Sequence, residues 1–287
     1  MTITTTKQAI EEAFLIKNAR RNKRRGHLGL SSAGKMCARE LWYGFRWALG
    51  SEDANARLQR LWRRGDREED WFIELLQNAG ITVFAADENG RQFTTLFANG
   101  HGGGSLDAVL VNTPEFGAEP VLGEFKTHND RSFAYLVANG LLRAHFTHYV
   151  QMQMYMKKFS LKNGLYFAVN KNDDELFIEK IAYCPLIADR YYARLKEIIF
   201  MPMPPPRVAT SPSKWSCVFC DYKHMCFSGQ TPLNNCRTCK HSRPVPEGNN
   251  APWSCVQHGY TITLQEQMEE HTCHEPLEIF ETPEEVV

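Results

Sequence analysis

Apolar residues recur every three or four positions between Arg57 and Ala79, and this spacing predicts an amphipathic helix. Gly80 follows directly and predicts the end of that helix, because glycine adopts terminating backbone conformations without a steric penalty. Four short apolar runs come next, over residues 81–86, 91–97, 105–111 and 120–126. The turn sequence DENG and the glycines of NGHGGG interrupt them, so we expect successive strands.

The second half of the chain returns to a helical pattern over about 131–159, in two pieces around Gly140. Strands are expected at 164–169 and 175–182, followed by a helix over 185–200 that the proline-rich MPMPPPR ends. This order predicts an α/β fold with a mixed central sheet flanked by helices. The remainder is rich in cysteine and has little regular pattern. We therefore expect two domains, residues 1–230 as the core and residues 231–287 as a small metal-binding module with an acidic tail.

The composition is that of a soluble globular protein, with 43% hydrophobic and 23% charged residues among 287. No apolar run reaches the roughly 18 residues of a membrane span. The N-terminal sequence lacks the apolar core of a signal peptide, so we expect a cytoplasmic protein without a membrane partner. Disulfides are rare in that compartment, and the nine cysteines are therefore expected to hold metal rather than to pair.

The net charge of zero conceals an uneven distribution along the chain. Fourteen Lys and Arg face only four acidic residues between Lys17 and Arg67, whereas the stretch from Glu266 onward has eight Glu and no Lys or Arg. A basic segment with interleaved aromatic residues would suit a nucleic-acid backbone and its bases. The alternative is a solvated basic helix whose aromatic residues belong to the core. The aromatic residues concerned are Trp42, Tyr43, Phe45, Trp47 and Trp62.

Two neighbouring strands of the expected sheet carry acidic residues. Asp107 lies in the run GSLDAVLV, and Glu124 and Lys126 share one face of the next strand because side chains alternate along a strand. Two carboxylates brought together repel each other, and a divalent cation would relieve this; hard oxygen ligands suit Mg²⁺ or Mn²⁺. A lysine beside the metal would activate water or neutralise charge on a phosphate. An isolated ExK is more commonly an exposed strand edge with a salt bridge.

Four motifs in register change that interpretation. The first is a glycine followed four residues later by Glu, at Gly65 and Glu69, and the second is GxxD, from Gly104 to Asp107. The third is ExK, from Glu124 to Lys126, and the fourth is QxxxY, from Gln151 to Tyr155. In order and spacing these motifs resemble the RecB-like branch of the PD-(D/E)XK nuclease superfamily, over roughly residues 30–230. The resemblance implies a restriction-endonuclease-like core and a metal-dependent deoxyribonuclease.

The resemblance also implies an active site of Glu69, Asp107, Glu124, Phe125 (through its carbonyl oxygen), Lys126, Gln151 and Tyr155. The carboxylates and the carbonyl would hold Mg²⁺ or Mn²⁺, the lysine would be catalytic, and the glutamine and tyrosine would contact the DNA strand or position the lysine. Many relatives have His where this chain has Glu69. Glu68, about 100° further round the helix, is the alternative at that position.

Cys217, Cys220 and Cys226 form a C-x2-C-x5-C run, one thiolate short of a four-coordinate site. Cys37 is the candidate fourth ligand. This arrangement, with one cysteine ahead of the core and three behind it, resembles that of the subset of RecB-like nucleases that hold a 4Fe-4S cluster. The resemblance implies that the cluster has a structural role. Zinc, which also accepts four thiolates, is the alternative.

A second cluster follows, with Cys236 and Cys239 in a CxxC knuckle and Cys255 sixteen residues later. Either Cys273 or His258 could complete it; Cys273 is preferred because it is otherwise a spare thiol. Zinc would stabilise a module too poor in apolar residues to fold unaided. The module would bind DNA or a protein partner, or only stabilise the C-terminus.

The sequence thus predicts a Mg²⁺- or Mn²⁺-dependent DNA exonuclease. It is similar to exonucleases that bacteriophages carry for DNA replication and recombination. This resemblance implies a host bacterial cytoplasm, with DNA and a recombination or replication protein as partners. It also resembles CRISPR-associated nucleases with the same cysteine arrangement, although the C-terminal module departs from these minimal forms. The alternatives are an endonuclease acting on structured DNA and a non-catalytic DNA-binding or assembly protein built on a nuclease scaffold. A zinc-dependent transcription factor is the weakest option, because the knuckle explains nothing about the core.

Overall fold

The computed structural model describes residues 5–18, 25–50 and 56–277. The chain divides into two compact units of three segments each. The first unit comprises Met1–Arg24, Ser51–Phe93 and Ser105–Cys184, and the second comprises Arg25–Gly50, Thr94–Gly104 and Pro185–Val287. This division differs from the boundary expected after residue 230, because two earlier segments belong with the C-terminal part of the chain. A separately folding 231–287 module therefore stays a prediction.

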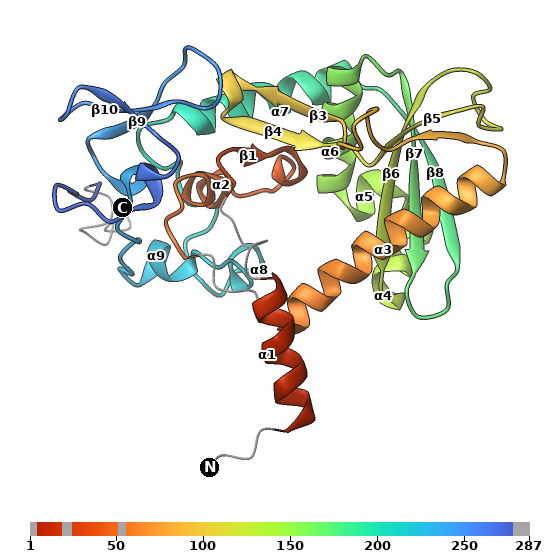
Figure 1. Ribbon diagram of the computed structural model, residues 1–287, viewed down its shortest axis with the longest axis horizontal. Helices are drawn as coiled ribbons and strands as arrows, with labels where there is room; N and C mark the ends of the chain where they lie inside the picture. The colour runs from red at the N-terminus through yellow and green to blue at the C-terminus, as the bar shows by residue number, and fades with distance from the viewer. Residues whose placement is uncertain (1–4, 19–24, 51–55, 278–287) are drawn as a thin grey trace. The chain divides into compact units, whose positions relative to one another are not determined.

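The first unit contains a five-stranded sheet in the order β2-β5-β6-β7-β8 (Figure 1). β6 and β7 are parallel and the other neighbouring strands are antiparallel, so the expected mixed sheet is confirmed. The expected strand at 91–97 is not part of it. The strands are β2 (Thr82–Phe84), β5 (Ala108–Val111), β6 (Val121–His128), β7 (Asn163–Asn170) and β8 (Leu176–Ala182).

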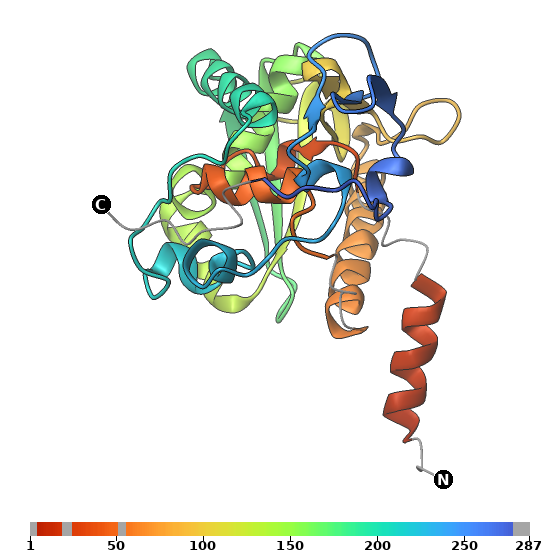
Figure 2. The ribbon, with the colours of Figure 1, turned by 90° about the vertical axis from the view of Figure 1, so that its left-hand side faces the viewer.

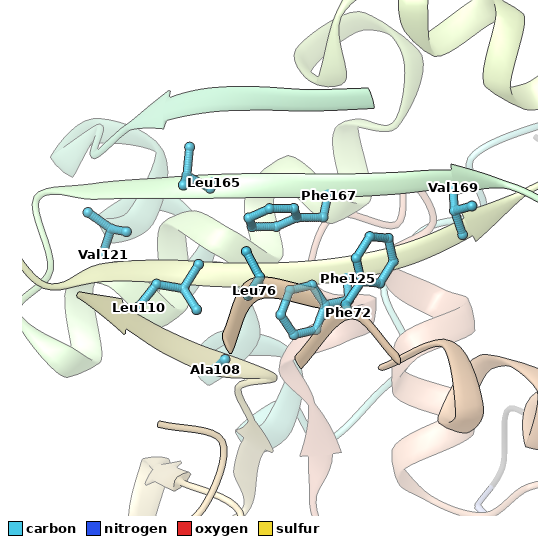
Figure 3. Packing of buried hydrophobic residues seen from close by; sticks show 9 residues of the cluster. All are labelled: Phe72, Leu76, Ala108, Leu110, Val121, Phe125, Leu165, Phe167 and Val169. Atoms are coloured by element: carbon cyan, nitrogen blue, oxygen red, sulfur yellow. The ribbon is translucent and has the colours of Figure 1, made fainter. Parts of the chain in front are cut away.

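Helices cover both faces of this sheet. α3 (Ala56–Asn78) packs against one face through Phe72 and Leu76, which join Phe125 and Phe167 in the hydrophobic core (Figure 3). The rings of Phe72 and Phe125 stack with centroids 5.2 Å apart. α6 (Phe146–Phe159) covers the opposite face of β6 and β7. Both strands are therefore almost wholly buried, which explains their long apolar runs.

The expected helix over residues 57–79 is confirmed as α3, one continuous helix drawn in orange in Figures 1 and 2. Gly80 ends it with φ +80°, a conformation that favours glycine. α1 (Thr6–Asn18) precedes it in the same unit. The helical stretch after β6 forms three pieces rather than two: α4 (Asp130–Asn139), α5 (Leu141–Ala144) and α6. Gly140 and His145 both leave helical φ and ψ, which divides the stretch twice.

The second unit has two small sheets. One has the order β1-β4-β3, built from β1 (Leu28–Gly29), β4 (Gly102–Ser105) and β3 (Thr94–Phe97). The last three glycines of NGHGGG, a stretch expected to separate strands, thus lie in β4 itself, while Gly100 ends the preceding 3-10 turn. A Cβ at Gly102 would lie 2.1 Å from the ring of Phe97, so only glycine allows this approach. The other sheet is antiparallel and contains β9 (Ser242–Pro244), β10 (Trp253–Cys255) and β11 (Tyr260–Ile262).

The second unit contains three buried arginines, Arg39, Arg46 and Arg237. Arg237 donates hydrogen bonds to the carbonyl oxygens of Phe45 and Gly26, each at 2.9 Å, and its guanidinium lies 3.7 Å from the ring centroid of Trp47. Arg46 donates to the carbonyl oxygen of Arg237 at 3.0 Å. The helices are α2 (Ala38–Phe45), α7 (Pro185–Phe200), α8 (Trp215–Val218) and α9 (Lys223–Phe227), with 3-10 turns at Leu30–Ser32, Ala98–Gly100, Cys236–Thr238 and Glu266–Met268.

None of the helices in the described ranges is long and apolar enough to cross a membrane.

Candidate active site

Alternation along β6 sends neighbouring side chains to opposite faces of the central sheet. Phe125 enters the hydrophobic core below α3, while Glu124 and Lys126 face α6. Gln151 of α6 donates a hydrogen bond from Nε2 to Glu124 Oε1 at 2.6 Å. The arrangement holds Glu124 fully buried, whereas the side chain of Lys126 keeps 24% of its surface exposed. Lys126 is therefore the more accessible group of the pair.

Asp107 lies at a bend just before β5 rather than inside a strand. Because Ala108 pairs with Gly123 in the antiparallel ladder, the residue before it comes opposite Glu124. Asp107 Oδ2 accepts a hydrogen bond from the Phe125 amide at 2.9 Å and lies 3.4 Å from Lys126 Nζ. The same ammonium contacts Glu124 Oε1 and donates to the Phe125 carbonyl oxygen at 2.9 Å. Lys126 thus joins the two carboxylates and the carbonyl.

Negative charge exceeds positive charge around this lysine. Burial raises the pKa of Glu124 to about 8, Asp107 adds to the rise, and Lys126 opposes it. Burial also raises the pKa of Glu69 on α3 to about 7, again with a contribution from Asp107. Burial by itself would lower the pKa of Lys126, but Glu124 and Asp107 together raise it. Three carboxylates therefore compete for one ammonium.

The electrostatic contacts distinguish the two candidate glutamates of α3. Glu69 interacts with Asp107 and Lys126, whereas Glu68 lies 3.7 Å from the guanidinium of Arg64 in an i,i+4 pair. The structure therefore brings Glu69, and not Glu68, to the carboxylate group.

Tyr155 and Gln151 lie behind Glu124 rather than on the surface, since only 2% and 5% of their respective surfaces are exposed. Burial raises the pKa of Tyr155, and Glu124 adds to the rise. Of the two roles expected for the QxxxY motif, this burial favours positioning the carboxylate and lysine over contact with a DNA strand.

The donor types suit a hard divalent cation. Glu124 Oε2 is buried and has no hydrogen-bond partner among the residues that the structure describes, so a further cationic or donor group would stabilise it. Within those same residues, no three His, Cys, Asp or Glu side chains are already gathered closely enough to hold a metal ion. The ammonium of Lys126 contacts the carboxylates of both Asp107 and Glu124. The residues fit such an ion in type and charge, provided that this ammonium moves off Glu124.

A hydrogen-bonded group of histidines lies next to the site, on the same face of the sheet. His128, two residues after Lys126, bonds the Tyr166 hydroxyl through Nε2 at 3.0 Å and the Ser132 hydroxyl through Nδ1 at 2.9 Å. His148 bonds the same Tyr166 hydroxyl at 2.9 Å. Burial lowers the pKa of His128 to about 4, so this ring is neutral near pH 7. Ser132 and Tyr166 reach His128 only in the folded protein, so its spacing in the sequence does not indicate these partners.

The first group of cysteines lies in the second unit. Cys37, Cys217, Cys220 and Cys226 all line one cavity, and Cys37 Sγ accepts a hydrogen bond from the Glu40 amide at the start of α2. Burial raises the pKa of Cys220 to about 11, so its thiol is protonated near pH 7. Binding of iron or zinc would require loss of such protons. The four expected ligands thus line one cavity, but among the described residues they are not close enough to one another to hold a metal ion as they stand, so metal binding and the identity of the metal stay predictions.

The second group lines a separate cavity of the same unit, with contributions from Cys236, Cys239, Cys255 and Cys273. Burial raises the pKa of Cys236 to about 12, and the three other thiols add to the rise. His258 lines the same cavity, and its Nε2 lies 3.3 Å from Cys273 Sγ. Both candidates for the fourth ligand are therefore present, and the choice between them stays open.

The aromatic residues of the basic segment separate into two classes. Trp42, Tyr43, Phe45 and Trp47 are at most 6% exposed and belong to the core of the second unit, whereas Trp62 on α3 is 53% exposed. These four residues are therefore part of the core and not of a nucleic-acid-binding surface. Parts of both charged segments lie outside the described residues: positions 19–24 and 51–55 of the basic one and 278–287 of the acidic one.

No protein-family model and no curated protein matches the sequence. Among solved structures, a protein named SSO0001 is similar with a TM-score of 0.47 and 15% identity, over 80% of this chain and 98% of that one. The alkaline exonuclease LHK-Exo from Laribacter hongkongensis is similar with a TM-score of 0.41 and 15% identity, over 65% of this chain and 90% of that one. LHK-Exo in complex with dAMP gives a TM-score of 0.39 and 13% identity, over 66% and 90%. Similarity of this degree establishes neither a common fold nor a common activity.

Proposed function

We propose that this protein is a Mg²⁺- or Mn²⁺-dependent DNA exonuclease, acting in replication or recombination, with its active site at Glu69, Asp107, Glu124 and Lys126. One observation carries the proposal: the carboxylates of Asp107 and Glu124 both contact one partly exposed lysine, and burial together with the charge of Asp107 raises the pKa values of Glu69 and Glu124. Such an excess of negative charge is costly unless a cation is bound. A purely structural ion pair would need one carboxylate.

A divalent metal ion, when bound by these carboxylates, would polarise a phosphate oxygen and lower the pKa of a bound water. The chain supplies the remaining functions. Asp107 is fixed by the Phe125 amide and Glu124 by Gln151, so both carboxylates are oriented before substrate arrives. Lys126 would turn from these carboxylates toward the substrate and stabilise the negative charge that develops on the phosphate.

We also propose that the two cysteine groups are structural metal sites, a 4Fe-4S cluster at Cys37, Cys217, Cys220 and Cys226 and a zinc ion at Cys236, Cys239, Cys255 and Cys273. The support is that each group lines one cavity of the second unit. Four thiolates satisfy either metal centre.

The test of the nuclease proposal is digestion of end-labelled linear DNA and of closed circular DNA with Mg²⁺, Mn²⁺ or EDTA. We expect progressive loss of the linear substrate only, abolished by EDTA and by Lys126→Ala. Lys180→Ala, which removes an exposed lysine of β8, is the matched control and should cut as the wild type does. Nicking of circles would favour the endonuclease. Absence of cleavage by protein purified without oxygen would favour the non-catalytic scaffold.

A further inference from the structure

Trp62 is a large aromatic residue on the helix that carries Glu69, and 53% of its surface is exposed. Isolated exposed apolar residues are common and by themselves carry no meaning. The position of Trp62 on α3 is what distinguishes it.

Trp62 and Glu69 are seven residues apart on one continuous helix. At about 100° per residue, seven residues fall within roughly 20° of two full turns, and they advance about 10 Å along the axis. The indole therefore lies on the same face of α3 as the candidate catalytic carboxylate, in line with it.

Gly65 lies between them on this face. A Cβ at this position would meet no heavy atom within 4 Å, so the surface at Gly65 itself is open. Glycine is a poor residue for a helix interior. At this point it leaves backbone on one side of the line from Trp62 to Glu69, while the exposed Asp66 lies on the other side, about 40° around the axis from Trp62.

The opposite face of the same helix has a different character. Arg60, Arg64 and Arg67 are exposed there, roughly 140–180° around the axis from Glu69. Two of them already make loose ion pairs, Arg60 with Glu11 and Arg64 with Glu68, each at 3.7 Å. The face that continues from Glu69 thus offers an aromatic surface rather than cations, which suits a base and not a phosphate.

We propose that Trp62 stacks on an unpaired nucleobase of the strand whose phosphate lies at Glu69 and Lys126, so that the protein engages DNA as a single strand near the cleaved bond. This rests on the proposed nuclease function. Inside a duplex, each base is stacked on its neighbours and paired, and neither face is available to an indole. Only an unpaired base can use Trp62, and base–aromatic stacking tolerates any sequence.

The test compares Trp62→Ala with wild type by binding a single-stranded oligonucleotide and a relaxed, covalently closed circular duplex, without added divalent metal. We expect the variant to lose about 5- to 100-fold in affinity for the single strand and less than about twofold for the closed duplex. The slope of affinity against salt should not change, since no phosphate contact is removed. The single strand should quench tryptophan fluorescence in the wild type and less in the variant.

Trp71→Ala is the matched control, because Trp71 lies on the same helix about 200° around from Glu69 and is 37% exposed. It should bind both ligands as the wild type does. Trp62→Tyr keeps an aromatic face and should recover most of the affinity, which a loss through misfolding would not allow.

Equal affinity of Trp62→Ala and wild type for the single strand would overturn the inference, and so would an equal loss for the closed duplex. Failure of the wild type to bind single strands would do the same. These outcomes are separate from failure of the proposed function. A protein that shows Trp62-dependent quenching yet cuts no DNA with Mg²⁺ or Mn²⁺ would retain the stacking site and lose the nuclease.

Discussion

Replacing Glu124 by Gln removes a buried carboxylate and keeps the shape of the side chain, so it tests the electrostatic strain at the site. In the folded protein the pKa of Glu124 is raised from 4.5 to about 8. Between these values the folded state binds a proton that the unfolded state has lost, so the stability of the wild type falls as pH rises through this window. Each pH unit costs about 1.4 kcal/mol.

From pH 5 to pH 7 this carboxyl therefore lowers the stability of the wild type by at most about 3 kcal/mol, because the charge of Lys126 opposes the rise in its pKa. Glu124→Gln lacks the titrating group and should not show that loss. Its free energy of unfolding should exceed the wild-type value by a margin that grows with pH, while cleavage is abolished. Glu69 is present in both proteins, so its own contribution to the pH dependence of stability largely cancels when the two are compared.

The assay is urea unfolding without added divalent metal at pH 5, 6, 7 and 8, followed by circular dichroism. A margin that is the same at every pH would refute the reasoning, because the cost would then come from packing rather than from charge. Adding Mg²⁺ at pH 8 provides the control. It should stabilise the wild type by about 2.7 kcal/mol at one hundred times its dissociation constant, and the variant much less.

Three further predictions follow from the same contacts. Phe125→Ala should lower the free energy of unfolding by about 3–5 kcal/mol, measured by urea unfolding, because it empties the ring stack with Phe72; a loss below about 1 kcal/mol would contradict the packing in Figure 3. Mn²⁺ affinity, measured by calorimetry, should rise between pH 6 and pH 8 as Glu69 and Glu124 lose protons, and a flat profile would argue against both as ligands. Cys217→Ser should lose iron and Cys236→Ser should lose zinc by metal analysis, each leaving the other metal in place; joint loss would mean that the two groups form one site.

Local pattern accounts for much of the first unit. The apolar period of α3 and the runs of β5 to β7 follow from which residues can be buried, and Gly80 ends α3 because of its backbone freedom. The alternation that pairs Glu124 with Lys126 on one face is a property of any strand. These are short-range consequences of the sequence, so they could be predicted from it.

Which strands pair with one another could not be predicted from local pattern. The run that contains β3 reads as a strand of the central sheet, yet it pairs with β4, a strand made mostly of glycine that no apolar period could indicate. The break at His145 and the separation of α5 from α6 likewise have no sequence signal, because the residue there is not a helix breaker.

The sequence by itself determined the spacing of the residues that carry chemistry. These are the four motifs, the eight cysteines expected to hold metal and the basic segment with its tryptophans. Only the tertiary structure decided which of these meet. It brought Glu69 rather than Glu68 to Asp107, buried Tyr155 behind Glu124, and left Trp62 exposed while Trp42 and Trp47 entered the core. The physical reason is that burial and charge pairing depend on contacts between residues far apart in the chain, whereas a sequence pattern records only neighbours.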